Sequence, residues 1–175
     1  MTDYAKIYGM KAQKREIVFW IILIAGIAID QISKYLVKIN MDYLQSITII
    51  PNVFSFTYIL NKGAAWSILE GYRWFFVIIG IVFLIALFIF RRHFSKNDQV
   101  LDIALAFICV GALGNMIDRV LHGAVVDFLH FTLISFPIFN VADCFISIAV
   151  AIIIWHLIIT PVIQKSKEST IKNNG

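Results

Sequence analysis

Residues 111–143 read GALGNMIDRVLHGAVVDFLHFTLISFPIFNVAD, and this stretch places three aspartates, two asparagines and an arginine in very apolar surroundings. One apolar helix is expected to enter the stretch from about Val100, and another is expected to leave it at Val141. A charged group at membrane depth costs about 3 kcal/mol or more unless it is paired or hydrated. The polar cluster therefore predicts a functional site where these two helices meet.

The whole chain has the composition of an integral membrane protein. Its 175 residues are 60% hydrophobic and 15% charged, whereas soluble chains are about 45–50% apolar. The net charge of +4 comes from the two tails and one short loop, so it indicates topology and not a nucleic-acid partner. Cys109 and Cys144 are expected at different depths, which argues against a disulfide or a shared metal ion.

Four long apolar segments predict a membrane α-helical fold with four transmembrane helices. We expect spans at about 17–37, 73–91, 99–119 and 141–161, in a single domain with flexible basic tails. Between helices one and two, residues 44–66 change to polar and β-branched residues that alternate with period two. This region predicts a small β-sheet that lies against the membrane surface.

The distribution of basic residues predicts the orientation. Of the 15 Lys and Arg, ten fall in the two tails and in the loop after the second span, and five fall on the opposite side. By the positive-inside rule, both termini are expected in the cytoplasm. The polar residues within the spans then share one level, near the outer membrane surface: Asp30, Lys34, Asn115, Asp118, Arg119, Asn140 and Asp143. Independent polar defects have no reason to share a depth, so we expect a single site.

Three local features of the sequence lead to further structural predictions. Asp30 and Lys34 are four residues apart on one helix face, which permits an ion pair. Whether this pair stabilises the fold or lines the site stays open. The NKGAAW segment at residues 61–66 contains Gly63, which allows an unusual backbone conformation. Asp102 lies near the basic loop and is expected to be solvated.

Carboxylates are the reactive groups that the sequence offers. It contains no HExxH, no CxxC and no glycine-rich phosphate loop. Two neighbouring aspartates share a proton readily and can activate a water molecule, as in aspartic proteases. Spacing alone does not choose which two of four aspartates face each other: Asp30, Asp118, Asp127 and Asp143.

The surroundings of the aspartates suggest separate roles. Asp143 is expected in the first turn of its helix, where the helix dipole favours an ionised carboxylate. Asp127 is expected in a short connection between the two helices, and its apolar neighbours favour the protonated form. Asp118 lies beside Arg119 and is expected to belong to a structural ion pair.

Other classes of function remain open at this point. An ion or proton transporter also uses membrane carboxylates, although the second and fourth spans offer almost no polar path. A metal-dependent enzyme would use His122 and His130 with Asp127 and Asp143. A purely structural membrane subunit would leave the shared depth of the carboxylates unexplained.

Five motifs in order carry a resemblance to a known family. They are DQISK (30–34), NKGAAW (61–66), GNMIDR (114–119), VVDF (125–128) and FNVAD (139–143). Together they closely resemble the bacterial lipoprotein signal peptidase family, also called signal peptidase II. The resemblance covers the chain except its tails. It implies a membrane aspartyl endopeptidase that removes signal peptides from diacylglyceryl-modified prolipoproteins, cutting on the N-terminal side of the lipidated cysteine.

The resemblance also implies roles for individual residues. Asp127 and Asp143 match the catalytic dyad of the family. Five residues match family positions that support the dyad or hold the substrate backbone, namely Asn61, Asn115, Asp118, Arg119 and Asn140. We add Asp30, Lys34 and Gly63 as further candidates for these roles. The family further implies a β-cradle on the outer face of the bacterial inner membrane, inhibition by the cyclic peptide globomycin, and no metal or other cofactor. We expect a monomer surrounded by membrane lipids, with no nucleic-acid partner.

Overall fold

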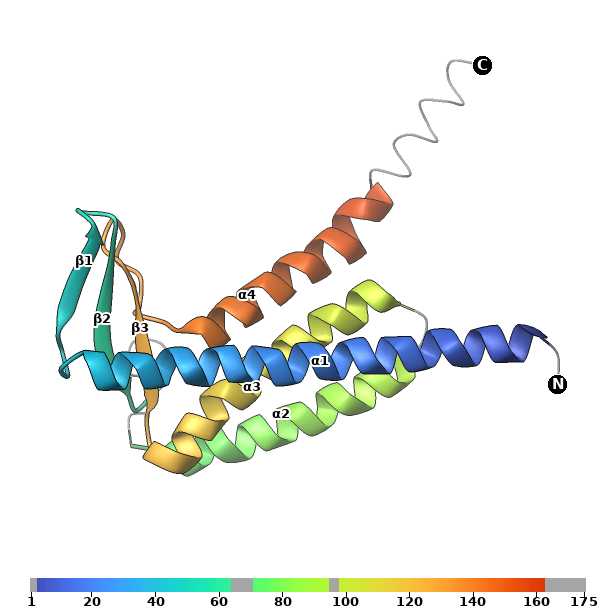
Figure 1. Cartoon of the computed structure of the whole chain (residues 1–175), viewed down its shortest axis with the longest axis horizontal. Helices are drawn as coiled ribbons and strands as arrows, with labels where there is room; N and C mark the ends of the chain where they lie inside the picture. Colours follow the sequence, from blue (N-terminus) through green and yellow to red (C-terminus); the bar gives the residue numbers. More distant parts are fainter. Residues whose placement is uncertain (1–2, 64–70, 95–97, 163–175) are drawn as a thin grey trace, which may run out of the picture.

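The structure, a computed structural model, describes residues 3–63, 71–94 and 98–162. Within these ranges the chain forms long helices at one side of a small sheet (Figure 1). The elements are α1 (Asp3–Asn40), β1 (Ser46–Ile50), β2 (Phe54–Asn61), α2 (Arg73–Phe94), α3 (Gln99–His122), β3 (Val125–Phe131), α4 (Val141–Ile154) and the short π-helix η2 (Trp155–Ile159). The chain is already helical from Asp3, well before the predicted start of the first span. The predicted C-terminal tail beyond residue 162 lies outside the described residues, as do Ala64–Trp66 of the NKGAAW motif.

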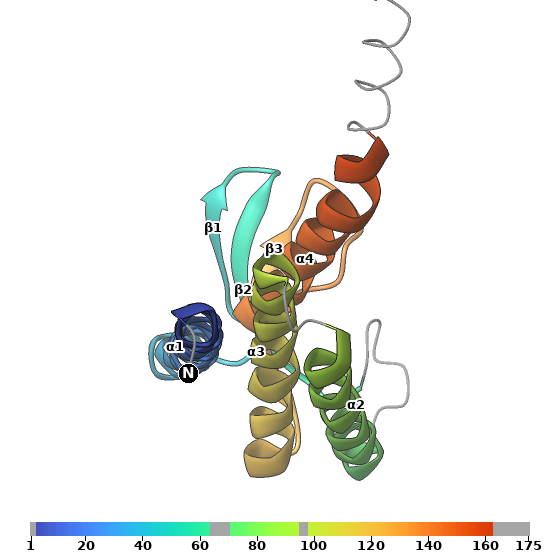
Figure 2. The ribbon, with the colours of Figure 1, turned by 90° about the vertical axis from the view of Figure 1, so that its right-hand side faces the viewer.

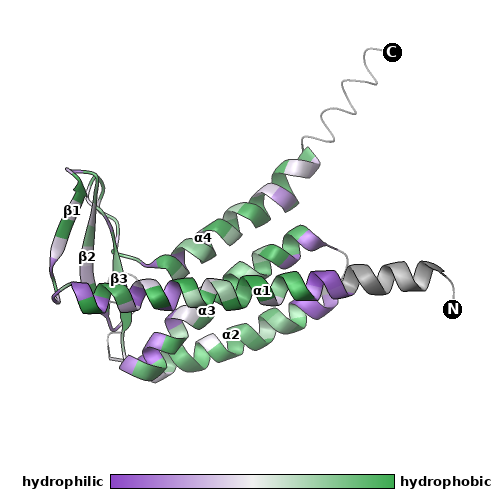
Figure 3. Cartoon of the chain, viewed as in Figure 1, coloured by the Kyte–Doolittle hydropathy of each residue, from purple (hydrophilic) through white to green (hydrophobic). Residues whose placement is uncertain are grey.

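Four helical segments are long and apolar enough to cross a membrane, namely 13–40, 73–93, 99–122 and 141–162. Large apolar side chains are exposed along them, including Ile24 of α1, Ile78 of α2 and Ile158 of η2. The outer surface of the helices is therefore hydrophobic along most of their length (Figure 3). These findings confirm the predicted class of four spanning helices with a small sheet.

Helix α3 is the centre of the helical part, because α1, α2 and α4 each pack against it. Viewed end-on, α3 lies between α1 and α2, and α4 approaches it from the side of the sheet (Figure 2). The core between the helices contains Phe19 and Leu23 of α1, Leu84 of α2, and Cys109 and Val110 of α3. Burial of these apolar side chains in contact with one another holds the helices together by close packing, as is usual in lipid.

Two glycines of α3 allow close approach of its neighbours. A Cβ atom on Gly111 would lie 2.6 Å from the backbone oxygen of Ala142 on α4. A Cβ atom on Gly114 would lie 2.5 Å from Oδ2 of Asp30 on α1. Any larger residue would push these groups away, so both glycines are needed for the observed packing.

The sheet contains a strand that the sequence did not predict. The order is β1-β2-β3 and both pairs are antiparallel. The predicted hairpin is present as β1 and β2. Asp127 was expected in a short connection but lies in β3, because Val125–Phe131 pairs with the free edge of β2. The sheet therefore includes a segment from between α3 and α4, and is not confined to the region between the first two helices.

The prediction for Asp102 was wrong. Its side chain is 2% exposed, and it forms an ion pair with Arg91 of α2, with Nε of Arg91 2.8 Å from its Oδ1. Glu16 of α1 also pairs with Arg91, at 2.9 Å. Asp102 is buried because α1 passes here between the end of α2 and the start of α3, and a buried carboxylate requires a cationic partner. The result is a charged junction at the end of the helices opposite the sheet.

Candidate active site

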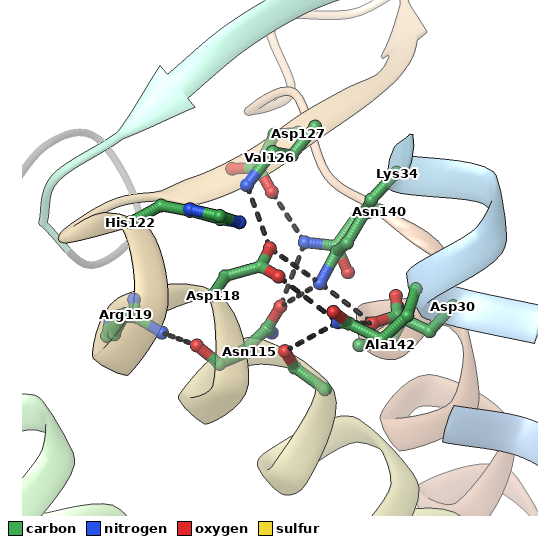
Figure 4. A network of polar contacts seen from close by, with 12 residues as sticks. Asp30, Lys34, Asn115, Asp118, Arg119, His122, Val126, Asp127, Asn140 and Ala142 are labelled. Carbon is green, nitrogen blue, oxygen red and sulfur yellow. Dashed lines mark hydrogen bonds and ion pairs between the residues drawn. The ribbon is translucent and has the colours of Figure 1, made fainter. Parts of the chain in front are cut away.

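Polar side chains from α1, α3, β3 and the start of α4 converge beneath the sheet (Figure 4). Asn61 of β2 joins them through its hydrogen bond to Asp127. The structure thus brings together residues that span more than a hundred positions in sequence. They are Asp30, Lys34, Asn61, Gly63, Asn115, Asp118, Arg119, Asp127, Asn140 and Asp143. These are the ten residues named from the sequence as candidates.

Asp127 is held on β3 with both carboxylate oxygens engaged. The side-chain amide of Asn61 donates to Oδ2 at 2.9 Å, and the amide of Asn140 donates to Oδ1. Asn61 can reach because the register of β2 and β3 pairs Ile59 with Asp127 and Asn61 with Val125. The pKa of Asp127 is raised to about 6, mainly by burial and also by the nearby charge of Asp143, although the amides of Asn61 and Asn140 and the charge of Lys34 lower it. This carboxyl therefore retains its proton to an unusually high pH.

Asp143 lies in the first turn of α4 and forms a reciprocal capping box with Asn140. The backbone N–H of Asp143 donates to Oδ1 of Asn140 at 3.1 Å, and the backbone N–H of Asn140 donates to Oδ2 of Asp143 at 3.2 Å. The amide of Asn115 donates to the other carboxylate oxygen at 2.8 Å. Such a capping box fixes the start of a helix and the rotamer of its acid. Asn140 therefore contacts both Asp127 and Asp143.

Lys34 supplies the buried positive charge of the site. Its Nζ lies 2.9 Å from Asp30 and 3.1 Å from Asp118, and it donates to Oδ1 of Asn115 at 3.1 Å. The side chain is 2% exposed, so the ion pairs are formed away from water. The predicted pair of Asp30 and Lys34 is present. Asp118 is a member of an ion pair as expected, with Lys34 as its partner rather than the adjacent Arg119.

Asp30 and Asp118 also hold backbone groups. Asp30 accepts a hydrogen bond from the backbone N–H of Ala142 at 2.9 Å, at the start of α4. Asp118 accepts one from the backbone N–H of Val126 at 3.1 Å, next to Asp127. These two carboxylates position the helix that carries Asp143 and the strand that carries Asp127. They are thus occupied as structural acceptors.

Gln31 is a participant that the sequence analysis missed. Its amide donates to Asp30 at 3.0 Å, to the backbone oxygen of Gly114 at 3.2 Å, and to Asp118 at 3.1 Å. The available signal was its position inside the DQISK motif, next to Asp30. A glutamine within an apolar helix is itself expected to need partners.

Arg119 and Gly63 lie together at the rim of the site. Nη2 of Arg119 donates to the backbone oxygen of Gly63 at 2.9 Å, and Nη1 donates to the backbone oxygen of Asn115 at 3.3 Å. The guanidinium also lies over the ring of Phe76, 4.9 Å from its centroid. Arg119 thus ties the end of β2 to α3.

A cavity of about 280 Å³ opens between these groups. Its walls contain both Asp127 and Asp143, and an apolar wall is formed by residues 136–139 of the connection to α4. The remaining lining residues are Asn61, Asn115, Arg119, Val125 and Asn140. Since a water molecule occupies about 30 Å³ of liquid, the cavity has room for water together with part of a larger molecule. Two carboxyl groups facing such a space can act as acid and base on one water.

The metal-ion alternative finds no ligand set in the part of the chain that the structure describes. His122 approaches Lys38 at 3.3 Å, and His130 contacts Oγ1 of Thr57 at 3.0 Å. Among the described residues, no three His, Cys, Asp or Glu side chains are arranged to hold a metal ion. The histidines therefore do not join the two aspartates of the cavity as ligands.

In the described ranges, fold and site together define a membrane protein with four helices long enough to span and a buried network of carboxylates and amides around a cavity. The chain belongs to the signal peptidase (SPase) II family, whose model matches residues 22–159. This membership makes it a peptidase and confirms the resemblance seen in the five motifs. It also disfavours the transporter and the purely structural subunit.

Individual relatives agree with this assignment. The chain is 42% identical over 143 residues to the "Lipoprotein signal peptidase" of Listeria monocytogenes serotype 4b (strain CLIP80459), which covers 81% of this chain and 93% of the relative. Two solved structures of bacterial membrane enzymes, both determined by the in meso method, are 39% identical in sequence to this chain. One has a TM-score of 0.76 and covers 80% of this chain and 87% of its own. The other has a TM-score of 0.75 and covers 81% and 92%.

Proposed function

We propose that this protein removes the signal peptide from diacylglyceryl-modified prolipoproteins by hydrolysing the peptide bond on the N-terminal side of the lipidated cysteine. Membership of the signal peptidase II family and the name of the Listeria relative support this substrate class. The observation that carries the chemistry is that Asp127 and Asp143 line one cavity and share Asn140 as a hydrogen-bond partner.

In the proposed mechanism the two carboxyl groups carry one proton between them. Asp143, at the helix N-terminus, is the ionised base, and Asp127 is the protonated acid, in keeping with its raised pKa. Asp143 removes a proton from water while the water oxygen attacks the scissile carbonyl carbon, and Asp127 gives its proton to the carbonyl oxygen. Asp143 then gives its proton to the amide nitrogen while Asp127 takes a proton back from a hydroxyl of the tetrahedral intermediate; the C–N bond breaks, and both acids return to their starting state.

The other site residues act by positioning. Asn61, Asn115 and Asn140 donate to the two carboxylates, so the acids cannot rotate freely away from the cavity. Fixing reacting groups in this way lowers the barrier because little reorganisation is needed. We assign Arg119 and Gly63, at the rim, to binding of the substrate backbone. Asp30, Lys34 and Asp118 hold the elements on which the acids lie.

The proposed location is the bacterial inner membrane, with both termini in the cytoplasm and the active site near the outer face. The excess of Lys and Arg at the opposite end of the helices supports this orientation. The sheet β1-β2-β3 then lies at the outer surface as a β-cradle above the scissile bond. We further propose that the protein acts as a monomer without a cofactor, in contact with membrane lipids, and that globomycin inhibits it.

The test is cleavage by the purified protein in lipid. A precursor carrying the diacylglyceryl group and a matched precursor lacking it are incubated separately, and the products are identified by mass spectrometry. We expect cleavage of the lipidated precursor alone, with the new N-terminus at the modified cysteine. Equal cleavage of the two precursors, or a different cut site, would contradict the proposed substrate. Parallel proton-flux measurements in liposomes should show no flux above protein-free controls.

A further inference from the structure

A second polar cavity lies at the other end of the helices, between the beginning of the α1 span and the end of α2. It measures about 510 Å³ and is lined by Arg15 and Glu16 of α1 and by Arg91, Arg92 and His93 of α2. This end of α1 and α2 forms a hydrophilic zone next to the apolar helix surfaces (Figure 3). We call it the basic pocket. None of its residues takes part in the candidate active site.

Arg91 is a fixed part of the basic pocket. It donates to both oxygens of Glu16, at 3.1 and 2.9 Å, and to both oxygens of Asp102, at 2.8 and 3.0 Å. Its guanidinium lies 3.7 Å from the ring centroid of Phe19. Since four of the five guanidinium N–H groups are engaged, Arg91 joins α1, α2 and α3 and has little capacity left for a ligand.

Because Arg91 is engaged by Glu16 and Asp102, the positive charge available to a ligand comes from Arg15 and Arg92. Nε of Arg15 lies 3.5 Å from Asp102, yet this buried nitrogen has no hydrogen-bond acceptor within the described part of the chain. Arg92 is exposed and forms no ion pair among the described residues. Three arginines thus meet two carboxylates, so the pocket has a positive surplus. An anion entering the pocket would balance this surplus of positive charge.

The surroundings favour an anion attached to lipid. Immediately toward the membrane, α1 exposes Ile17 and Trp20, which are 51% and 47% exposed. The ring of Trp20 is stacked on Phe88 of α2, with centroids 6.4 Å apart. This apolar surface lies where acyl chains would run from a head group held in the pocket. Arginine binds phosphate through paired N–H groups.

We infer that the basic pocket binds the phosphate of an anionic phospholipid, with Arg15 and Arg92 as its ligands and its acyl chains along Trp20 and Ile17. The lipid would join α1 to α2 at the end opposite the active site. This inference does not depend on the proposed function, because binding can be measured without any cleavage.

The test uses the full chain in detergent and measures retention of added phosphatidylglycerol by native mass spectrometry, with phosphatidylcholine and inorganic phosphate as separate probes. We expect phosphatidylglycerol to bind preferentially, and Arg15→Gln or Arg92→Gln to weaken its binding about tenfold, as expected for loss of one charged hydrogen bond. Lys14→Gln is the matched control, because Lys14 is exposed at the same end and does not line the pocket.

Several outcomes would overturn the inference. Equal binding of phosphatidylcholine would exclude selection of an anionic lipid, and an equal loss in Lys14→Gln would show a diffuse charge effect. Competition by inorganic phosphate at the concentration of the lipid would indicate a free-phosphate site instead. Arg92→Gln keeps this test decisive if Arg15→Gln fails to fold, because Arg92 forms no ion pair within the described part of the chain. Unchanged lipid binding in folded Arg92→Gln would also contradict it.

Discussion

Asn140 and Asp143 hold each other at the first turn of α4 through two reciprocal hydrogen bonds of 3.1 and 3.2 Å. The Asn140 amide also donates to Asp127 on β3 and to Asn115 on α3. One fully buried asparagine therefore fixes the start of a membrane helix and the relative position of two acids. Loss of this side chain should disturb the geometry of both acids at once.

Replacing Asn140 by alanine should lower kcat by about 100-fold, with a much smaller change in KM, because preorganisation of the acids is lost while the binding groups remain. The lost helix cap should destabilise the fold by about 1 kcal/mol, and loss of the buried hydrogen bonds to Asp127 and Asn115 adds to this cost. Steady-state kinetics on a lipidated precursor would measure this. Asn40→Ala is the control, since the Asn40 side chain is exposed and donates a hydrogen bond to the backbone of its own helix. A variant Asn140→Ala with wild-type kcat would show that Asn140 does not position the acids.

Replacing Lys34 by methionine should destabilise the protein by about 3–5 kcal/mol, because Asp30 and Asp118 would lose their buried cation. Thermal unfolding in detergent would measure the change. Lys38→Met, one helical turn away and exposed, should leave the melting temperature nearly unchanged. The double variant Asp30→Asn with Lys34→Met should recover part of the loss. Equal stability of Lys34→Met and Lys38→Met would contradict the buried ion-pair account.

Replacing Gly114 by alanine should reduce both stability and activity, because its Cβ would lie 2.5 Å from Oδ2 of Asp30 and 3.1 Å from Cβ of Ala142. We expect a cost of about 1–3 kcal/mol from overpacking. Gly80→Ala is the matched control, since its nearest contact would be Sδ of Met116 at an ordinary 3.5 Å. Melting temperatures and cleavage rates of the two variants would be compared. Similar behaviour of both variants would mean that α3 can yield at Gly114.

The pKa of Asp127 predicts how stability varies with pH. Burial raises this pKa from 3.8 to about 6 in the folded protein, so the folded state binds more protons than the unfolded state between these values. The stabilising contribution is complete below about pH 4 and is lost as the pH rises through 6, a change of about 3 kcal/mol.

The measurement is the difference in stability between wild type and Asp127→Asn across this range. The wild type should lose stability relative to the variant as the pH rises from 4 to 7, whatever constant offset the asparagine introduces. Parallel curves for the two proteins would show that the pKa of Asp127 is not raised. A plot of kcat/KM against pH should be bell-shaped, because its two limbs report the two apparent pKa values of the pair Asp127 and Asp143.

The features that could be predicted from sequence were those with a local signal. Apolar runs of about 20 residues predict spans because every backbone group must be satisfied within lipid. The four-residue spacing of Asp30 and Lys34 correctly indicated an ion pair. The five motifs correctly indicated the family.

The features that were missed depend on contacts between distant segments. Strand β3 was read as a connection, because VVDFLHF lacks strict alternation and its pairing with β2 spans some seventy residues of chain. Asp102 was read as solvated, since its partners Arg91 and Arg15 come from other helices. The choice of Asp127 and Asp143 as the pair came from the family resemblance alone, because no spacing rule fixes how β3 and α4 face a common cavity.

The most direct measurement is the rate at which purified Asp127→Asn and Asp143→Asn variants cleave a lipidated precursor in lipid, with and without a chelator. Both variants should fold and bind substrate, yet each should lose at least about 100- to 10,000-fold in rate, and the wild-type rate should not respond to the chelator. A folded variant of either aspartate that cleaves at the wild-type rate would contradict the proposed dyad.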